Sequence, residues 1–214
     1  MLTELSIEFL KSNLPFYNKL TMGQQELFIS KAFESIMKNS NISHNSDKEC
    51  IGLIIVVDGT LRVFLNSQEG KEITLYKLLA GDCCVFTSSC IFNNINFQVN
   101  LETIEDSRVI ILPSKFVDYL SKNNIEFQQY ILQLTQSKMS EVMYLIEQIL
   151  FTSFDKRLKE YLLSFNSEHI EITHSTIAKD LGTAREVVSR MLKHFENEGM
   201  IKVSRGAIDL INLF

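Results

Sequence analysis

Three glycines divide the middle of the chain at equal intervals, with Gly59, Gly70 and Gly81 lying eleven residues apart. Leu61, Val63 and Leu65 recur at every second position, and 51–57 is apolar and largely β-branched. Alternation with a period of two is typical of a strand with one buried face, and glycine readily adopts the backbone conformations of tight turns. Short strands at regular spacing therefore predict a small antiparallel barrel or jelly roll.

Further strands follow the third glycine, and helical sequence precedes the first strand. Residues 96–103 and 109–112 predict two strands, and Pro113 ends the strand region. Residues 6–37 are amphipathic and are interrupted at 14–16, so we expect helices in pieces there. The fold class that these patterns predict is α+β.

A stretch without glycine or proline, from 124 to 150, predicts one long helix. Two series of residues recur every seven positions in it, which is the a/d pattern of a coiled coil. A stripe of this length favours pairing with a second copy of the chain, since two-fold homodimers are the commonest oligomers. The alternative is a long core helix within one domain, and Leu134, Met143 and Leu145 indicate a second buried face. The repeat positions are Leu132, Met139 and Ile146, with Thr135, Val142 and Ile149.

Three helices and a hairpin are predicted for the C-terminal part. Apolar side chains recur at helical spacing over 155–165, and 175–181 predicts a short helix. A second amphipathic helix spans 184–198 and ends at Gly199. Residues 201–210 predict a β-hairpin after it. This succession is that of a helix-turn-helix followed by a β-wing.

The turn between the two short helices has suitable residues. Ala178 is small enough for two helices to cross closely, and Gly182 supplies a positive φ. We expect Thr183 to cap the second helix, with Glu186 three residues later completing a capping box. The residues expected to face the core are Val187, Val188, Met191, Leu192 and Phe195.

Four residues project outward from the first two turns of that second helix, where a recognition helix contacts base edges. Arginine can donate two hydrogen bonds to guanine, and glutamate can accept one from cytosine. The alternative is that Glu186 and Arg190, at i and i+4, form only a surface ion pair. The predicted base-reading residues are Arg185, Glu186, Ser189 and Arg190.

Cationic and hydroxyl side chains around the motif suit phosphate contacts, which give affinity without sequence information. A module that binds only protein through the same helices is the alternative to DNA binding. The predicted phosphate-contacting residues are Thr173, Ser175, Thr183, Lys193, His194 and Arg205.

These motifs together resemble the Crp/Fnr family, named for the cyclic-AMP receptor and the fumarate–nitrate regulator. The resemblance rests on 182–190 (Gly-Thr-Ala-Arg-Glu-Val-Val-Ser-Arg), 57–63 (Val-Asp-Gly-Thr-Leu-Arg-Val) and 79–82 (Leu-Ala-Gly-Asp), and it extends over essentially the whole chain. It implies a β-roll sensor domain over 1–113 that is similar to cyclic-nucleotide-binding domains. It further implies a dimerisation helix region over 114–151 and a winged helix-turn-helix over 152–214.

The family resemblance also implies a function. Its members are homodimeric transcription regulators on palindromic operators, and Glu186, Ser189 and Arg190 fall at the base-reading positions. The Glu-x-x-Ser-Arg form is similar to the fumarate–nitrate branch, so our hypothesis is a half-site that contains TGA. RNA polymerase is a further candidate partner.

The sensor half departs from the cyclic-nucleotide binders of the family. Those proteins use a glutamate for the ribose and an arginine for the cyclic phosphate. Residues 81–89 contain no glutamate, and Phe97 occupies the arginine position. We therefore do not expect cyclic AMP, and the aromatic lining, with Phe86 and Phe97, favours an apolar ligand or none. No resident cofactor is expected.

Three cysteines of the same region are candidates for sensing chemistry. Cys83, Cys84 and Cys90 lie within eight positions, and Cys50 precedes them. Buried structural thiols, thiol redox sensing and metal binding are the three alternatives. No Cys-x2-Cys pair is present, so no metal site is predicted.

Composition limits the setting. The net charge is −5, while residues 155–214 hold nine basic and nine acidic side chains and are neutral. No apolar run is long enough to span a membrane, and the first ten residues carry glutamates but no basic residue, unlike a secretory signal. We therefore expect a cytoplasmic protein. We do not expect an enzyme, because the sequence contains no recognisable set of catalytic residues.

Overall fold

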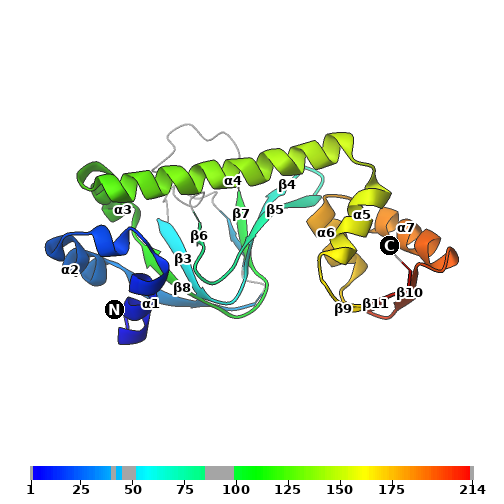
Figure 1. Ribbon diagram of the computed structural model, residues 1–214, viewed down its shortest axis with the longest axis horizontal. Helices are drawn as coiled ribbons and strands as arrows, with labels where there is room; N and C mark the ends of the chain where they lie inside the picture. Colours follow the sequence, from blue (N-terminus) through cyan, green and yellow to red (C-terminus); the bar gives the residue numbers. More distant parts are fainter. Residues whose placement is uncertain (1, 40–41, 45–51, 85–98, 213–214) are drawn as a thin grey trace. The chain divides into compact units, whose positions relative to one another are not determined.

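The computed structural model describes residues 2–39, 42–44, 52–84 and 99–212. The chain forms two compact units, one of Met1–Phe64 with Leu75–Val142 and one of Leu65–Thr74 with Met143–Phe214. The elements are α1 (Glu4–Asn13), η1 (Tyr17–Lys19), α2 (Met22–Lys31), β1 (Phe33–Met37), β2 (Ile42–His44), β3 (Leu53–Asp58), β4 (Leu61–Asn66), β5 (Glu72–Leu78), β6 (Cys83–Cys84), β7 (Asn100–Thr103), β8 (Ser107–Leu112), α3 (Ser114–Asn123), α4 (Ile125–Phe151), α5 (Phe154–Leu163), β9 (His169–Glu171), α6 (His174–Leu181), α7 (Arg185–Asn197), β10 (Ile201–Ser204) and β11 (Ala207–Leu210) (Figure 1).

Two four-stranded sheets form the β-roll, with strand orders β1-β8-β3-β6 and β2-β7-β4-β5. The pairs β1–β8, β3–β8, β3–β6, β2–β7 and β4–β7 are antiparallel. The three evenly spaced glycines all have positive φ, at 89° for Gly59, 77° for Gly70 and 95° for Gly81. The predicted turns and the predicted α+β class are therefore confirmed.

Helices cover one face of the first sheet. Leu53, Ile55 and Val57 of β3 belong to a buried cluster with side chains of α1, α2, α3 and the first turns of α4. Ile54 and Val56 point to the opposite face of the strand and are also buried, at 1% and 0% exposure. Because both faces of β3 are buried, apolar residues occupy successive positions of the strand and do not alternate with polar ones.

One segment of the N-terminal region was predicted wrongly. Phe33–Met37 lies in the stretch expected to be helical, and it is strand β1. Helix α2 ends at Lys31, and Ala32 is already extended, with ψ at 150°. The strand pairs with β8 from Phe33 opposite Ile111 to Met37 opposite Ser107. Pairing with a distant strand thus outweighs the local helical pattern.

Helix α4 confirms the long predicted helix, with Ile125 and Phe151 as its ends. Phe127 and Ile131 are buried in the core of the first unit. Leu134 and Leu145 are half-buried as expected, but Met143 is 53% exposed, so its predicted burial was wrong. Met143 follows Met139 by four residues and therefore shares its face of the helix. Among the described residues, no helix combines the length and apolarity that crossing a membrane requires.

The C-terminal part of the second unit consists of α5, α6, α7 and a three-stranded sheet of order β10-β11-β9. The predicted hairpin is the pair β10–β11, in register from Ile201 opposite Leu210 to Ser204 opposite Ala207. Strand β9 was not predicted, and it adds to the free edge of β11. The three-part division of the chain at residues 113/114 and 151/152 remains a prediction.

Candidate nucleic-acid interface

Helices α6 and α7 are fixed by one apolar core. Ile177 and Ala178 of α6 and Val188, Leu192 and Phe195 of α7 are at most 6% exposed. The three α7 residues recur at i, i+4 and i+7, so they form one stripe of the helix. The opposite side of the helix carries exposed side chains. Val187 and Met191, also predicted to face the core, are half-buried at its margin.

Helix α6 begins with a side-chain cap. Thr173 is the N-cap residue, and its Oγ1 accepts a hydrogen bond of 3.1 Å from the backbone N–H of Thr176. This bond satisfies one of the amide groups left unpaired at a helix start. The predicted phosphate-contacting hydroxyl of Thr173 therefore already has a role within the chain.

The turn between α6 and α7 depends on one glycine. Gly182 has φ at 64° and ψ at 42°, the left-handed conformation that glycine adopts without steric cost. The N–H of Thr183 then donates to the carbonyl of Ala178 over 3.0 Å, which ends α6. The predicted cap of α7 was wrong: the N-cap residue is Ala184, without a side-chain hydrogen bond, since Thr183 still belongs to the turn.

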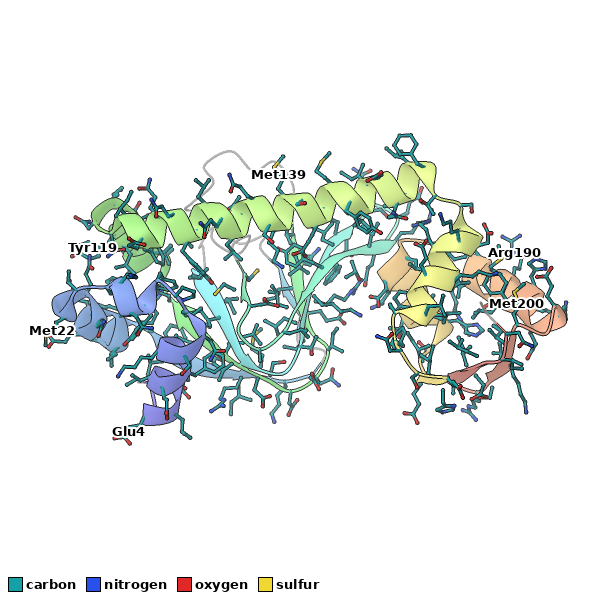
Figure 2. All side chains as sticks on the ribbon, in the orientation of Figure 1. Glu4, Met22, Tyr119, Met139, Arg190 and Met200 are labelled. Atoms are coloured by element: carbon teal, nitrogen blue, oxygen red, sulfur yellow. The ribbon has the colours of Figure 1, made fainter. Side chains whose placement is uncertain are left out.

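The four predicted base-reading residues lie on one side of α7. Arg185, Glu186 and Arg190 are exposed, and Ser189 is half-buried. Figure 2 labels Arg190 on this helix. His194 Nε2 of α7 lies 3.4 Å from Glu198 Oε1 just after the helix, whereas among the described residues of α7 no ion pair joins Glu186 to Arg190. The surface-pair alternative is therefore not supported.

The predicted phosphate-contacting residues come from α6, the turn after it, α7 and the hairpin. Thr173 and Ser175 lie at the start of α6, and both are exposed. Lys193 and His194 are exposed on the third turn of α7. Arg205 is exposed in the hairpin turn between β10 and β11, and Thr183 is half-buried in the turn before α7.

Several residues that the sequence reasoning missed support α6. The Tyr161 hydroxyl of α5 donates to Asp180 Oδ2 over 2.6 Å, and burial together with that carboxylate raises the pKa of Tyr161. Arg157 Nη1 donates to the carbonyl of Leu181 over 3.2 Å, so a cation interacts with the C-terminus of α6. These pairs are 19 and 24 residues apart, and no local motif indicates them.

The hairpin tip Leu65–Thr74 belongs to the same compact unit as these helices. Thr74 Oγ1 donates to Asp180 Oδ1 over 2.9 Å, and Lys179 Nζ lies 3.1 Å from Glu72 Oε2. Ile73 contacts Gly182, because a Cβ on that glycine would lie 2.5 Å from Ile73 Cδ1. The turn of the helix-turn-helix is therefore contacted by a segment more than 100 residues away in sequence.

A hydrogen bond between two side chains links α6 and α7 directly. His174 Nδ1 of α6 lies 2.9 Å from Ser189 Oγ of α7. Burial, reinforced by the charge of Arg185, lowers the pKa of His174. No local sequence pattern indicates this contact, because the two residues lie fifteen positions apart.

The predicted sensor residues are only partly described. Cys83 and Cys84 form β6, are each 1% exposed, and are not joined in a disulfide. The Tyr130 hydroxyl of α4 donates to Cys83 Sγ over 3.2 Å, and burial raises the pKa of the Cys83 thiol to about 12. The other predicted members, Cys50, Phe86, Cys90 and Phe97, lie outside the described residues. No group of three or more metal-ligating side chains occurs in the described part of the chain.

The predicted seam of α4 is exposed along much of its length. Leu132 is 57% exposed, Met139 63%, and Ile146 and Ile149 42% each, and Val142 is half-buried. Figure 2 shows Met139 on the side of α4 away from the strands of the first unit.

Residues 156–213 match the model of the Crp-like helix-turn-helix domain. The whole chain is similar to the crystal structure of a transcriptional regulator of the Crp/Fnr family from Eubacterium rectale. The two are 37% identical with a TM-score of 0.87, over 93% of this chain and 94% of that one. The chain belongs to the Crp/Fnr family.

Other Crp/Fnr relatives are more distant. The fumarate and nitrate reduction regulatory protein of Vibrio cholerae is 23% identical over 93% of this chain and 82% of its own length. The regulator CLP of Xanthomonas campestris shares the fold, with a TM-score of 0.76 and 14% identity over 89% of this chain and 99% of that one. Membership of the Crp/Fnr family makes the protein a DNA-binding transcription regulator. The family consists of regulators rather than enzymes. The predicted β-roll with a winged helix-turn-helix is confirmed.

Proposed function

We propose that the protein binds a palindromic operator as a homodimer, with α7 of each copy in the major groove. The observation that carries this proposal is the division of α7 into two sides. Val188 and Leu192 are fully buried, while Arg185, Glu186 and Arg190 are exposed on the first two turns. A recognition helix contacts base edges with these turns.

The exposed groups have the chemistry of base recognition. The planar guanidinium of Arg190 can donate to O6 and N7 of guanine together, and Glu186 can accept from N4 of cytosine. Both bases occur in a TGA half-site and its complement, which is why this half-site remains our proposal. Lys193 and Arg205 provide cations for the flanking phosphates.

The stripe on α4 supports the homodimer. Four large apolar side chains at heptad spacing are 42% to 63% exposed. An exposed apolar stripe on one helix is the kind of surface that a coiled-coil partner covers. A second copy carries the same stripe, so a two-fold axis would bury both. The residues are Leu132, Met139, Ile146 and Ile149.

We further propose that a signal in the β-roll acts through α4 and changes the separation of the two recognition helices. Helix α4 is continuous over 27 residues and packs on the β-roll core through Phe127 and Ile131. Cys83 is proposed to be a structural residue, because its side chain is 1% exposed and burial raises the pKa of its thiol, which favours the protonated form.

Binding-site selection followed by anisotropy titrations tests the proposal. Two arginine variants form a matched pair. Arg190→Ala is expected to relax discrimination at one base pair by about 1–3 kcal/mol. Arg205→Ala is expected to lower affinity for all sequences alike. The base-reading assignment is wrong if R190A discriminates as the wild type does, and the half-site is wrong if selection returns no TGA core.

A further inference from the structure

The hydrogen bond between His174 and Ser189 bears on how the operator is read. In the described part of the chain, Ser189 is the only one of the four predicted base-reading side chains that bonds to another side chain. Its partner comes from the first residue of α6, fifteen positions earlier. The bond therefore joins the two helices of the motif at the surface that we propose faces the bases.

A serine hydroxyl by itself is an ambiguous reader. It has one hydrogen to donate and two lone pairs to accept with, so it can bond to either kind of base group. Once its hydrogen is engaged by another acceptor, only the lone pairs remain for the DNA. The partner of the hydroxyl thus decides which bases it can recognise.

The surroundings of His174 favour a neutral ring. The side chain is half-buried, Arg185 of α7 is close enough to act on it by its charge, and the N-terminus of α6 adds a partial positive charge. A neutral ring with its proton on Nε2 presents Nδ1 as a bare acceptor. Ser189 Oγ–H can then donate to Nδ1 across the 2.9 Å that separates the two atoms.

We infer that His174 is a positioning residue that makes Ser189 a hydrogen-bond acceptor toward the operator. The inference rests on the proposed function, since it assumes that Ser189 faces a base. The recognised group is then an exocyclic amino group in the major groove, N6 of adenine or N4 of cytosine. His174 itself need not contact DNA.

Operators without one amino group test this directly. The contacted base is first located as the position at which Ser189→Ala changes discrimination. That adenine or cytosine is then replaced by purine or pyrimidin-2-one, which lack the amino group. We expect the wild type to lose affinity about fivefold, the low end of the cost of a mismatched pair. S189A should lose none, and His174→Ala should lose at most about twofold.

Controls and opposite outcomes separate the inference from the proposed function. His169→Ala removes an exposed histidine of β9 and should respond to the analogue as the wild type does. The doubly substituted H174A/S189A protein should behave as S189A does. The inference is overturned if H174A loses as much affinity for the operator without the amino group as the wild type does. It is also overturned if H174A loses affinity equally for every sequence. If S189A differs from the wild type at no position, the base-reading proposal itself has failed.

Discussion

Replacing Gly182 by alanine tests how the helix-turn-helix turn is held, and Gly199 provides a matched control. Both glycines have left-handed φ, at 64° and 72°, and both follow the end of a helix. An alanine in this conformation costs about 1–2 kcal/mol at either position. The loss of backbone freedom in the unfolded chain is the same for both substitutions and cancels in the comparison.

The two sites differ in what an added Cβ would meet. At Gly199 no atom lies within 4 Å. At Gly182 the Cβ would lie 2.5 Å from Cδ1, 2.8 Å from Cγ1 and 3.2 Å from Cβ of Ile73, so that side chain must shift. Such overpacking costs about 1–3 kcal/mol. We therefore expect destabilisation of about 1–2 kcal/mol for G199A and about 2–5 kcal/mol for G182A.

Native-state hydrogen exchange of the α6 and α7 amides measures these costs, because it reports local opening free energies in a chain with two units. Ile73→Ala combined with each glycine variant completes the test. It should recover most of the excess cost in G182A and nothing in G199A. Equal costs for the two glycine variants, or no recovery with I73A, would refute the packing of the hairpin tip on this turn.

Three further predictions concern other parts of the molecule. Tyr161→Phe removes a charge-assisted hydrogen bond to half-buried Asp180 and should reduce the stability of α6 by about 1.5–3 kcal/mol in the same exchange experiment. Asp209 raises the pKa of His169 above its ordinary value of 6.5. The contact between the two side chains therefore stabilises the folded state fully below pH 6.5, and this stabilisation is lost as the pH rises through the raised pKa. The difference in melting temperature between the wild type and His169→Ala should shrink between pH 6 and pH 9. Met139→Glu places a charge on the 63% exposed seam of α4 and should shift sedimentation toward the monomer, whereas an unchanged dimer would contradict the seam.

Local sequence signals predicted the helix-turn-helix well. Helix α7 was expected over 184–198 and spans Arg185–Asn197, because an apolar stripe and a terminating glycine define it within its own sequence. The α4 helix and the glycine turns of the β-roll were predicted for the same reason. In each case, the residues that determine the element belong to the element itself.

Contacts between distant segments were not predictable in this way. Phe33–Met37 became a strand because β8, more than seventy residues later, offers it an edge. The bond from His174 to Ser189 depends on the crossing of α6 and α7, and the single wrong cap at Thr183 depends on how far the turn extends. Helical periodicity identifies which side of α7 is free, but it does not show which neighbouring side chain holds each residue on that side.

The charge of the chain limits how much of its affinity for DNA can be independent of base sequence. The chain carries −5 overall, and its C-terminal 60 residues are neutral, so little non-specific attraction to phosphates is available. Near the recognition face, Lys193 and Arg205 are the exposed cations assigned to phosphates, while Arg185 and Arg190 are assigned to bases. His194 Nε2 lies 3.4 Å from Glu198 Oε1.

On the proposed homodimer, two phosphate-directed cations from each copy would neutralise about four phosphates. The logarithm of the binding constant should then fall with the logarithm of salt concentration with a slope of about −4. Lys193→Ala, which removes one cation from each copy, should reduce that slope by about 2. A wild-type slope of about −8 would contradict this division of roles, since the arginines of α7 would then act on phosphates rather than on bases. A shallow slope with strong discrimination is what an acidic regulator needs, because its selectivity must come from base contacts rather than from general attraction to DNA.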